Sequence, residues 1–196
     1  MAGNLVRIID YKTGTKEYKL ANILNGKDLQ LIVYLIAVND DKKNFEPVGA
    51  FYISLSDEIE DLDGSIIDDK KIELELIRKF AFDGILLDTD GKAIQLMDNE
   101  AEGKTSPIVR QRRNYKLSAD EFRKLSNFVK KYAASLVKDI KAGKIDLKPL
   151  RESKNKSSCT YCDYKGICKF DKKIDTFRFR DFDSTKTIKD LEDIDE

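Results

Sequence analysis

A short hydrophobic stretch near the start of the chain ends in an aspartate and a lysine two positions apart. Asp10 and Lys12 follow the aliphatic residues 5–9, and Thr13-Gly14 interrupts the pattern directly afterwards. Such a run predicts a β-strand, on which residues two apart point to the same face. A carboxylate beside an ammonium group can hold a hard cation such as Mg²⁺, orient a water and stabilise charge on a phosphate. This pair could therefore hydrolyse a phosphodiester without a histidine.

The D-x-K spacing alone favours an ordinary surface ion pair, and it is the context that distinguishes Asp10 and Lys12 from the other pairs with this spacing. The Asp-x-Lys pattern also begins at Asp40, Asp69, Asp139, Asp146 and Asp171. Asp10, however, is followed by an apolar segment at residues 27–39, whose length favours a buried helix over a strand. Gln30 and Tyr34 lie four apart on it, so both could reach one cleft from the same helical face. Tyr34 could equally be a core aromatic.

The composition excludes several kinds of chemistry. None of the 196 residues is a histidine, which removes Ser-His-Asp and Cys-His nucleophilic pairs, histidine general bases and H-E-x-x-H metal sites. The remaining chemistry must use carboxylates, lysines, cysteines or a metal. Charged residues make up 37% of the chain, but 36 basic and 36 acidic residues cancel, so no net charge attracts a polyanion.

The charge is nevertheless unevenly distributed along the chain. Residues 51–100 contain 14 acidic and 5 basic residues, net −9, whereas residues 101–150 contain 13 basic and 5 acidic residues, net +8. A locally basic face is therefore possible, and it would position a nucleic-acid backbone without reading its sequence. The candidate phosphate contacts are Lys104, Arg110, Arg112, Arg113 and Lys116. A solvated charged face explains these residues equally well.

Three cysteines lie close together near the end of the chain, at positions 159, 162 and 168. Cys159 and Cys162 are spaced to bind one centre, with Cys168 on a short loop. A tetrahedral zinc site would need a carboxylate or an outside ligand, and a cubane iron–sulfur cluster would need one more cysteine. Three unrelated reduced thiols are the alternative. No signal-peptide pattern occurs and the longest aliphatic run, 31–38, is far below the roughly 20 residues that span a bilayer, which indicates a soluble, cytoplasmic protein.

The wider pattern predicts an α/β fold with a mixed sheet flanked by helices and a C-terminal cysteine loop. The expected elements are strands at 5–12 and 48–55, a solvated loop at 57–69, an extended segment at 72–76 and a short helix at 90–97. Ser118-x-x-Glu121 is a capping box that begins a long amphipathic helix, and Gly143 suits its end. From Thr176 the charged chain predicts a surface helix or a disordered end. We divide the chain into a core at 1–150, a cysteine segment at 151–175 and a tail at 176–196.

Both motifs near the start of the chain resemble a known family. IIDYKTG at residues 8–14, followed by LQLxxY at 29–34, resembles the (D/E)-x-K motif and Q-x-x-x-Y helix of RecB-like nucleases in the PD-(D/E)XK superfamily. The resemblance implies a partial nuclease core in which Asp10 and the main-chain carbonyl of Tyr11 bind Mg²⁺. It implies that Lys12 is catalytic and that Gln30 and Tyr34 complete the site.

The end of the chain resembles the C-terminal nuclease region of the AddB family of helicase–nuclease subunits. The resemblance rests on CTYCDYKGIC at 159–168, preceded by a long helix and an Ile-x-Leu-x-Pro segment at 145–149. It implies that the three cysteines join a fourth, far upstream, in a 4Fe-4S cluster. It also implies a 5′ to 3′ exonuclease that acts on DNA with an AddA-like helicase–nuclease subunit, resecting double-strand breaks for homologous recombination.

Several features of that family have no counterpart here. They are the histidine and the metal-binding aspartate before the D-x-K strand, the fourth cysteine, the helicase-like domains and a phosphate-binding loop. We therefore expect a truncated fragment that exposes a sheet edge, depends on the missing upstream part of the protein and has little activity alone.

Two alternatives remain at this point. One is a non-catalytic binding or scaffold domain with a structural cysteine site. The other is a CRISPR-associated RecB-like exonuclease, which shares these motifs but carries its first cysteine and first metal aspartate in one short chain.

Overall fold

The protein is built around a four-stranded mixed sheet. The computed structural model describes residues 4–14, 16–41, 45–55, 77, 80–87, 92–98, 101, 106, 108–109 and 114–191. The strands are β1 (Leu5–Lys12), β2 (Glu46–Ser54), β3 (Asp83–Leu86) and β4 (Tyr115–Lys116), and they neighbour one another in this order. β1 is parallel to β2, β2 antiparallel to β3, and β3 parallel to β4. The expectation of an α/β fold with a mixed sheet is therefore confirmed.

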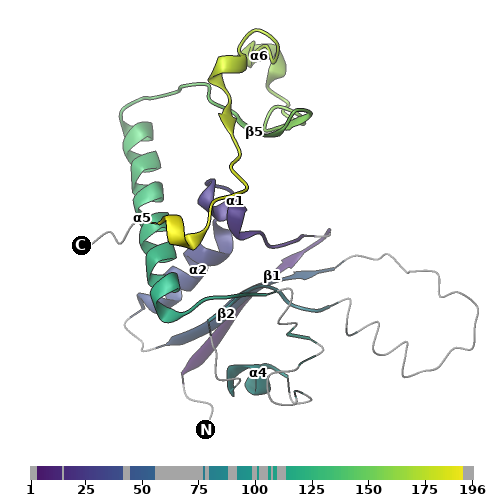
Figure 1. The fold of residues 1–196 in the computed structure, drawn as a ribbon, viewed down its shortest axis with the longest axis vertical. Coiled ribbons are helices and arrows are strands. Elements are labelled where there is room, and N and C mark those ends of the chain that lie inside the picture. The colour runs from purple at the N-terminus through teal and green to yellow at the C-terminus, as the bar shows by residue number, and fades with distance from the viewer. Residues whose placement is uncertain are drawn as a thin grey trace, which may run out of the picture.

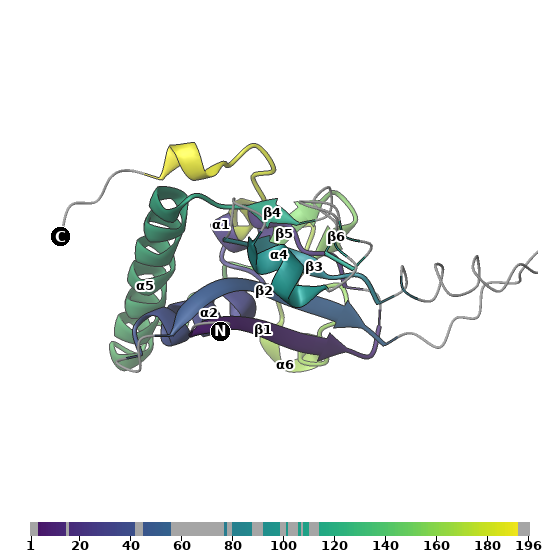
Figure 2. The same cartoon turned by 90° about the horizontal axis from the view of Figure 1, so that it is seen from below.

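Helices cover both faces of this sheet. A parallel strand pair needs a crossover connection, and β1 reaches β2 through α1 (Leu20–Leu24) and α2 (Gln30–Asn39). α5 (Ala119–Lys141) packs against α2 on the same side of the sheet, whereas α4 (Lys92–Met97) lies on the opposite side (Figures 1 and 2). The D-x-K strand and the helix after it are thus consecutive parts of one β–α–β unit.

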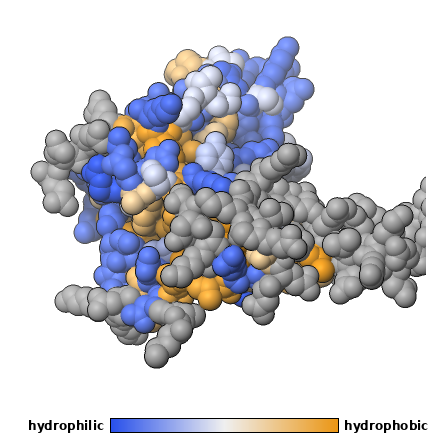
Figure 3. Space-filling model, turned by 60° about the horizontal axis from the view of Figure 1, so that its bottom comes forward, coloured by the Kyte–Doolittle hydropathy of each residue, from blue (hydrophilic) through white to orange (hydrophobic). Residues whose placement is uncertain are grey.

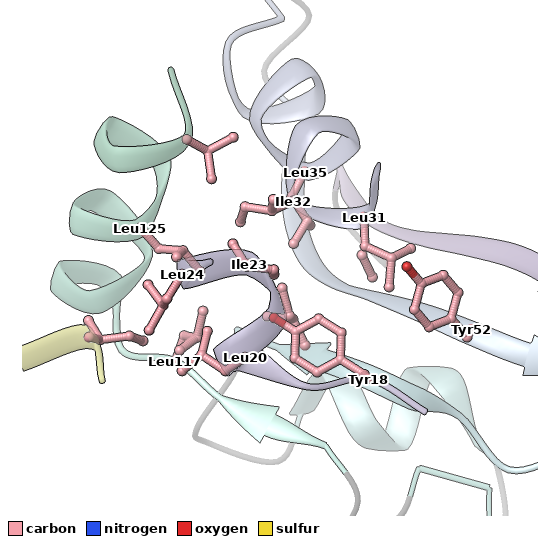
Figure 4. Packing of buried hydrophobic residues seen from close by; sticks show 14 residues of the cluster. Tyr18, Leu20, Ile23, Leu24, Leu31, Ile32, Leu35, Tyr52, Leu117 and Leu125 are labelled. Carbon is pink, nitrogen blue, oxygen red and sulfur yellow. The ribbon is translucent and has the colours of Figure 1, made fainter. Parts of the chain in front are cut away.

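The alternation of side chains along the strands divides the core into two clusters. On β2, Ala50 and Tyr52 join the cluster beneath α1, α2 and α5, while Phe51 and Ile53 join the cluster on the α4 side. Figure 4 shows the first cluster, in which side chains from α1 and α2 meet Leu125 of α5. Each fully buried Leu or Ile contributes about 1.5–3 kcal/mol. Because β2 is buried on both faces, it fixes the position of β1 beside it.

The element boundaries depart from the sequence expectations at two places. β1 has the expected bounds, but α2 begins at Gln30 rather than at residue 27, because Asp28 adopts a left-handed conformation with φ of 50°. β2 begins at Glu46 rather than at residue 48. Pro47 lacks the N–H that a regular ladder uses, and the register with β1 shifts between Val6 and Arg7 at this point. The segments expected at 57–69 and 72–76 lie outside the described residues.

The long helix α5 is capped as the sequence predicts. The Ser118 hydroxyl accepts a hydrogen bond from the Glu121 backbone N–H at 3.2 Å, and the Glu121 carboxylate accepts one from the Ser118 N–H at 2.9 Å. Gly143 follows the helix with φ of 67°, a conformation that costs glycine little. Within the described residues, no helix has both the length and the apolarity needed to cross a membrane.

A small second sheet carries the cysteine segment. Its strands are β5 (Leu150–Ser153), β6 (Lys156–Ser157) and β7 (Arg180–Asp181), and β5 lies in the middle of the sheet. Along the chain, the short helix α6 (Lys165–Cys168) comes after β6 and before β7. Figure 1 shows this part beyond the end of α5, from which the chain returns alongside that helix. In the view of Figure 3, apolar side chains emerge between hydrophilic ones over the middle of the molecule.

The last part of the chain differs from the expected surface helix or disordered end. Through Leu191 it forms β7 and the 3₁₀ turns Thr176–Arg178 and Ile188–Asp190. Ile188 is buried in the main core, and the Asn25 side chain bonds to the backbone of Asp183 through both its amide nitrogen and its oxygen, at 2.8 and 3.0 Å. One buried isoleucine and one side-chain anchor give no periodicity in the sequence, which is why this expectation was wrong. The domain boundaries themselves stay a prediction.

Replacing Ile188 with alanine tests this packing. The change should reduce the free energy of unfolding by about 2 kcal/mol, because it removes buried methyl groups from the core. Urea denaturation measures the difference. Ile174→Ala is the matched control, since that side chain is 74% exposed and its loss should change stability by less than about 0.5 kcal/mol. Equal effects of the two changes would show that the end of the chain does not pack as described.

Candidate active site

The four side chains singled out by the two motifs meet at the end of β1. The Lys12 ammonium lies 2.7 Å from Asp10 Oδ2 and donates a hydrogen bond to Gln30 Oε1 at 2.9 Å. Gln30 Nε2 in turn donates to the Tyr34 hydroxyl at 3.0 Å. A continuous line of contacts therefore runs from a carboxylate through an ammonium and an amide to a phenol. Tyr34 is 43% exposed, so it is not the core aromatic that the sequence also allowed.

The β–α–β unit explains why these residues meet. Asp10 and Lys12 share a face of β1 with Ile8, which packs against the cluster beneath α2, whereas Ile9 packs on the opposite face. The crossover brings α2 back over the first of these faces, with Gln30 at its first turn. Gln30 and Tyr34, four residues apart, consequently point to the same place.

The main chain of Tyr11 faces away from β2. The Lys12 carbonyl accepts a hydrogen bond from the Leu55 N–H on the β2 side at 2.7 Å. Successive carbonyls of a strand point in opposite directions, so the Tyr11 carbonyl is directed to the other edge of β1. In the described part of the sheet β1 is the terminal strand, and this carbonyl lies at its open edge, where no described strand pairs with it.

Asp10 has an oxygen that suits a cation. Oδ2 is shielded from solvent and forms an ion pair with Lys12, yet it accepts no hydrogen bond of good geometry from any described residue. Carboxylate and carbonyl oxygens are the ligands that Mg²⁺ prefers, and it commonly binds through one or two carboxylates together with water and substrate phosphates. Asp10 and the Tyr11 carbonyl therefore fit part of such a site. Among the described residues, no three His, Cys, Asp or Glu side chains are close enough to hold one metal ion.

A second ion pair beside this site was missed in the sequence. The Lys16 ammonium lies 2.7 Å from Asp28 Oδ1, and Asn22 Nδ2 donates to Asp28 Oδ2 at 2.6 Å. Burial alone would raise the pKa of Asp28, but these two hydrogen bonds and the charge of Lys16 outweigh it and hold that pKa below its usual value. The pair joins the loop after β1 to the turn before α2. No spacing rule connects residues 16 and 28, so the sequence carried no signal for it.

Tyr52 is the other residue whose place the sequence did not reveal. It lies opposite Asp10 on β2, only 2% exposed, and reads in the sequence as one more core aromatic. Burial, followed by the nearby charges of Asp28, Asp10 and Asp83, raises the pKa of Tyr52 to about 12. Its phenol therefore stays neutral in this buried place near three carboxylates.

The three cysteines line one cavity of about 300 Å³ in the C-terminal part. All three are free and partly exposed, and Phe170 and Asp171 complete part of the lining. They are not gathered closely enough for a site that binds a single ion. The structure therefore places the three thiols around one cavity without bringing them to the spacing of a single-ion site.

One of the five expected phosphate contacts, Lys116, lies among the described residues. Residues 104, 110, 112 and 113 lie outside the described part of the chain, so their prediction stays untested. Lys116 is exposed on β4, which β2 and β3 separate from β1.

Comparison with known proteins identifies the class to which this fold and site belong. A model of the PD-(D/E)XK nuclease superfamily matches residues 2–169, and the chain is a member of that superfamily.

The chain is also similar to named proteins of the genus Bacillus. It is 30% identical over 208 residues to the B subunit of the ATP-dependent helicase/deoxyribonuclease of Bacillus mycoides (strain KBAB4), covering 98% of this chain and 17% of that protein. The same identity holds over 207 residues for the corresponding protein of Bacillus anthracis, with 97% of this chain and 17% of the relative covered. The chain thus spans about a sixth of the length of these relatives.

The Lys16–Asp28 pair leads to a pH-dependent prediction. Lys16→Met should raise the pKa of Asp28 and cost up to about 1 kcal/mol of stability at neutral pH. Because the native pKa of Asp28 is lowered, the stability that the pair contributes is present above pH of about 4 and is lost as the pH falls through the native value. Carboxyl NMR titration and urea denaturation at several pH values measure both effects.

Lys19→Met is the control for this change. Lys19 pairs with Glu17, both side chains being more than half exposed, so its replacement should leave the titration of Asp28 as it is. An Asp28 pKa that is the same with and without Lys16 would contradict the described pairing.

Proposed function

We propose that the chain is the metal-dependent nuclease module of a helicase/deoxyribonuclease subunit and cleaves DNA phosphodiester bonds. The observation that carries the proposal is the contact line from Asp10 through Lys12 and Gln30 to Tyr34, placed at the open edge of β1. Membership of the PD-(D/E)XK superfamily and the names of the Bacillus relatives support a deoxyribonuclease. A bound divalent cation, Mg²⁺ in this proposal, would acidify a water and stabilise charge on the phosphate.

Each residue of the site has a distinct role in this proposal. Asp10 Oδ2 and the Tyr11 carbonyl would hold the cation. Lys12 donates hydrogen bonds to a phosphate oxygen or to the attacking water, because an ammonium has three donors and Gln30 occupies one of them. Gln30 keeps that ammonium in place, and its bond to Tyr34 fixes the amide. The half-exposed Tyr34 is positioned to contact the DNA backbone.

Among the described residues, Asp10 is the one carboxylate assigned to the cation, so a second carboxylate would come from outside the described residues. A strand that pairs with the open edge of β1 could bring a second carboxylate beside the Tyr11 carbonyl. We therefore expect weak activity from this chain by itself and stronger activity in a longer protein that carries it. The 5′ to 3′ direction, a role in recombination with a second, AddA-like subunit, and a cytoplasmic location are further parts of this proposal.

Substitutions at the D-x-K pair test the proposed activity. Asp10→Ala and Lys12→Ala should each reduce divalent-metal-dependent cleavage of linear DNA by roughly a hundredfold or more, because each removes a group that contacts the metal or the reacting phosphate. The assay uses this chain and, in parallel, a full-length protein that carries it. Asp139→Ala and Lys141→Ala are matched controls, since they have the same D-x-K spacing on α5, and both should cleave normally. Undiminished cleavage by the Asp10 and Lys12 variants would refute the proposed site.

The cysteine cavity supports a second part of the proposal, a 4Fe-4S cluster held by Cys159, Cys162 and Cys168 with a fourth ligand from outside the described residues. The cluster would join this segment to another part of a longer chain. Three thiols around one cavity favour a cluster over unrelated thiols. This function is structural and compatible with the nuclease site, because the cysteines lie on the chain between β6 and β7 of the small sheet, outside the sheet that carries Asp10 and Lys12.

Iron content after anaerobic purification tests the cluster. Cys162→Ser should lower bound iron and the visible absorption of the protein to a small fraction of the unmodified level, because the thiolate is lost. Tyr161→Ser alters the neighbouring residue, which is 90% exposed, and should retain iron. Zinc in place of iron, or equal iron content in both variants, would contradict this assignment.

A further inference from the structure

Tyr52 occupies a place in the sheet that no motif assigns to it. It is the direct partner of Asp10 on the β1 side and of Asp83 on the β3 side, so the three residues form one row across the sheet. Residues in register project from the same face, which here is the face covered by α2. Figure 4 shows the Tyr52 ring at the margin of the core, beside Leu31 of α2 and near Tyr18. Tyr52 is only 2% exposed, so its ring is packed among other groups of the protein.

Two ammonium groups lie over this ring. Lys12 Nζ is 5.2 Å from the ring centroid and Lys16 Nζ is 6.0 Å from it. Both distances fall within the range of cation–π attraction. Each lysine also has a carboxylate partner at 2.7 Å, Asp10 for Lys12 and Asp28 for Lys16. Each lysine therefore lies between its own carboxylate and the face of the same Tyr52 ring.

The Tyr52 ring matters most for the position of the Lys12 ammonium when Asp10 binds a cation. If Asp10 binds a cation, as in the proposed function, its charge is no longer fully available to Lys12. The remaining contacts of the ammonium among the described residues are then Gln30 Oε1 and the Tyr52 ring. A ring attracts the ammonium through its face without accepting a strong hydrogen bond, so donors stay available for a phosphate oxygen or a water.

We infer that Tyr52 is a positioning residue whose aromatic ring keeps the Lys12 ammonium at the reacting phosphate, an inference that rests on the proposed function. The ring, rather than the hydroxyl, carries this role. Lys16 also contacts the ring, but other bonds hold it in place. Its backbone N–H donates to Ser54 Oγ at 3.3 Å, and its ammonium donates to Asp28 Oδ1.

The first test is spectroscopic and needs no nuclease activity. In the full chain with ¹³C-labelled lysine, the Hε signals of Lys12 and Lys16 should lie upfield of the signal of the exposed Lys148, because the ring current of Tyr52 shields them. Lys12→Arg and Lys16→Arg assign the two signals. Tyr52→Phe should preserve the upfield shifts and Tyr52→Leu should abolish them. If the Lys12 signal of the unmodified protein coincides with that of Lys148, the inference fails, whether or not Tyr52→Leu folds.

The second test separates positioning from folding and from substrate binding. In metal-dependent DNA cleavage, Tyr52→Leu should lower kcat by roughly tenfold to a hundredfold and leave KM nearly unchanged, whereas Tyr52→Phe should restore kcat. A Tyr52→Leu variant that cleaves normally while Asp10→Ala does not would overturn the inference. So would a Tyr52→Phe variant as impaired as Tyr52→Leu, since that result assigns the effect to the hydroxyl. Failure of the proposed function itself would appear separately, as identical cleavage by the unmodified chain and Asp10→Ala.

Discussion

The parallel pairing of β1 with β2 is the constraint on which the site depends. Two parallel neighbours cannot be joined by a tight turn, so the chain must cross over the sheet between them, and it does so through α1 and α2. That crossover covers the face to which Asp10 and Lys12 point and brings Gln30 and Tyr34 onto it. The same pairing places Tyr52 in register with Asp10. The strand pairing that packs the core thus also brings together the groups of the site, which are a carboxylate, an ammonium, an amide and two phenols.

The elements that were predictable from the sequence are those with a strong local signal. The strand at residues 5–12 is marked by β-branched residues and a Thr-Gly stop, and α5 by its capping box and terminal glycine. Once these were placed, the i and i+4 rule was enough to put Gln30 and Tyr34 on one face of α2. The contact of Lys12 with Asp10 follows from the strand rule, whereas its bond to Gln30 also needs the crossover that brings α2 over β1. Their roles in catalysis remain proposals.

The features that escaped prediction all depend on contacts between distant parts of the chain. Lys16 and Asp28 meet because the loop after β1 folds back onto the turn before α2, and Tyr52 meets Lys12 through strand register. Ile188 reaches the core although it lies in a strongly charged stretch, because α5 and the C-terminal segment run side by side (Figure 1). Hydrophobic periodicity cannot show a single buried residue or an ion pair between loops.

The central claim is that Asp10, at the open edge of β1, takes up a divalent cation beside Lys12. The most direct measurement is the paramagnetic broadening of assigned NMR signals of the full chain by substoichiometric Mn²⁺. We predict broadening centred on residues 10–12 and on the side chains of Gln30 and Tyr52, and its disappearance in Asp10→Ala. Broadening spread over the exposed carboxylates, and equally strong in Asp10→Ala, would contradict the account.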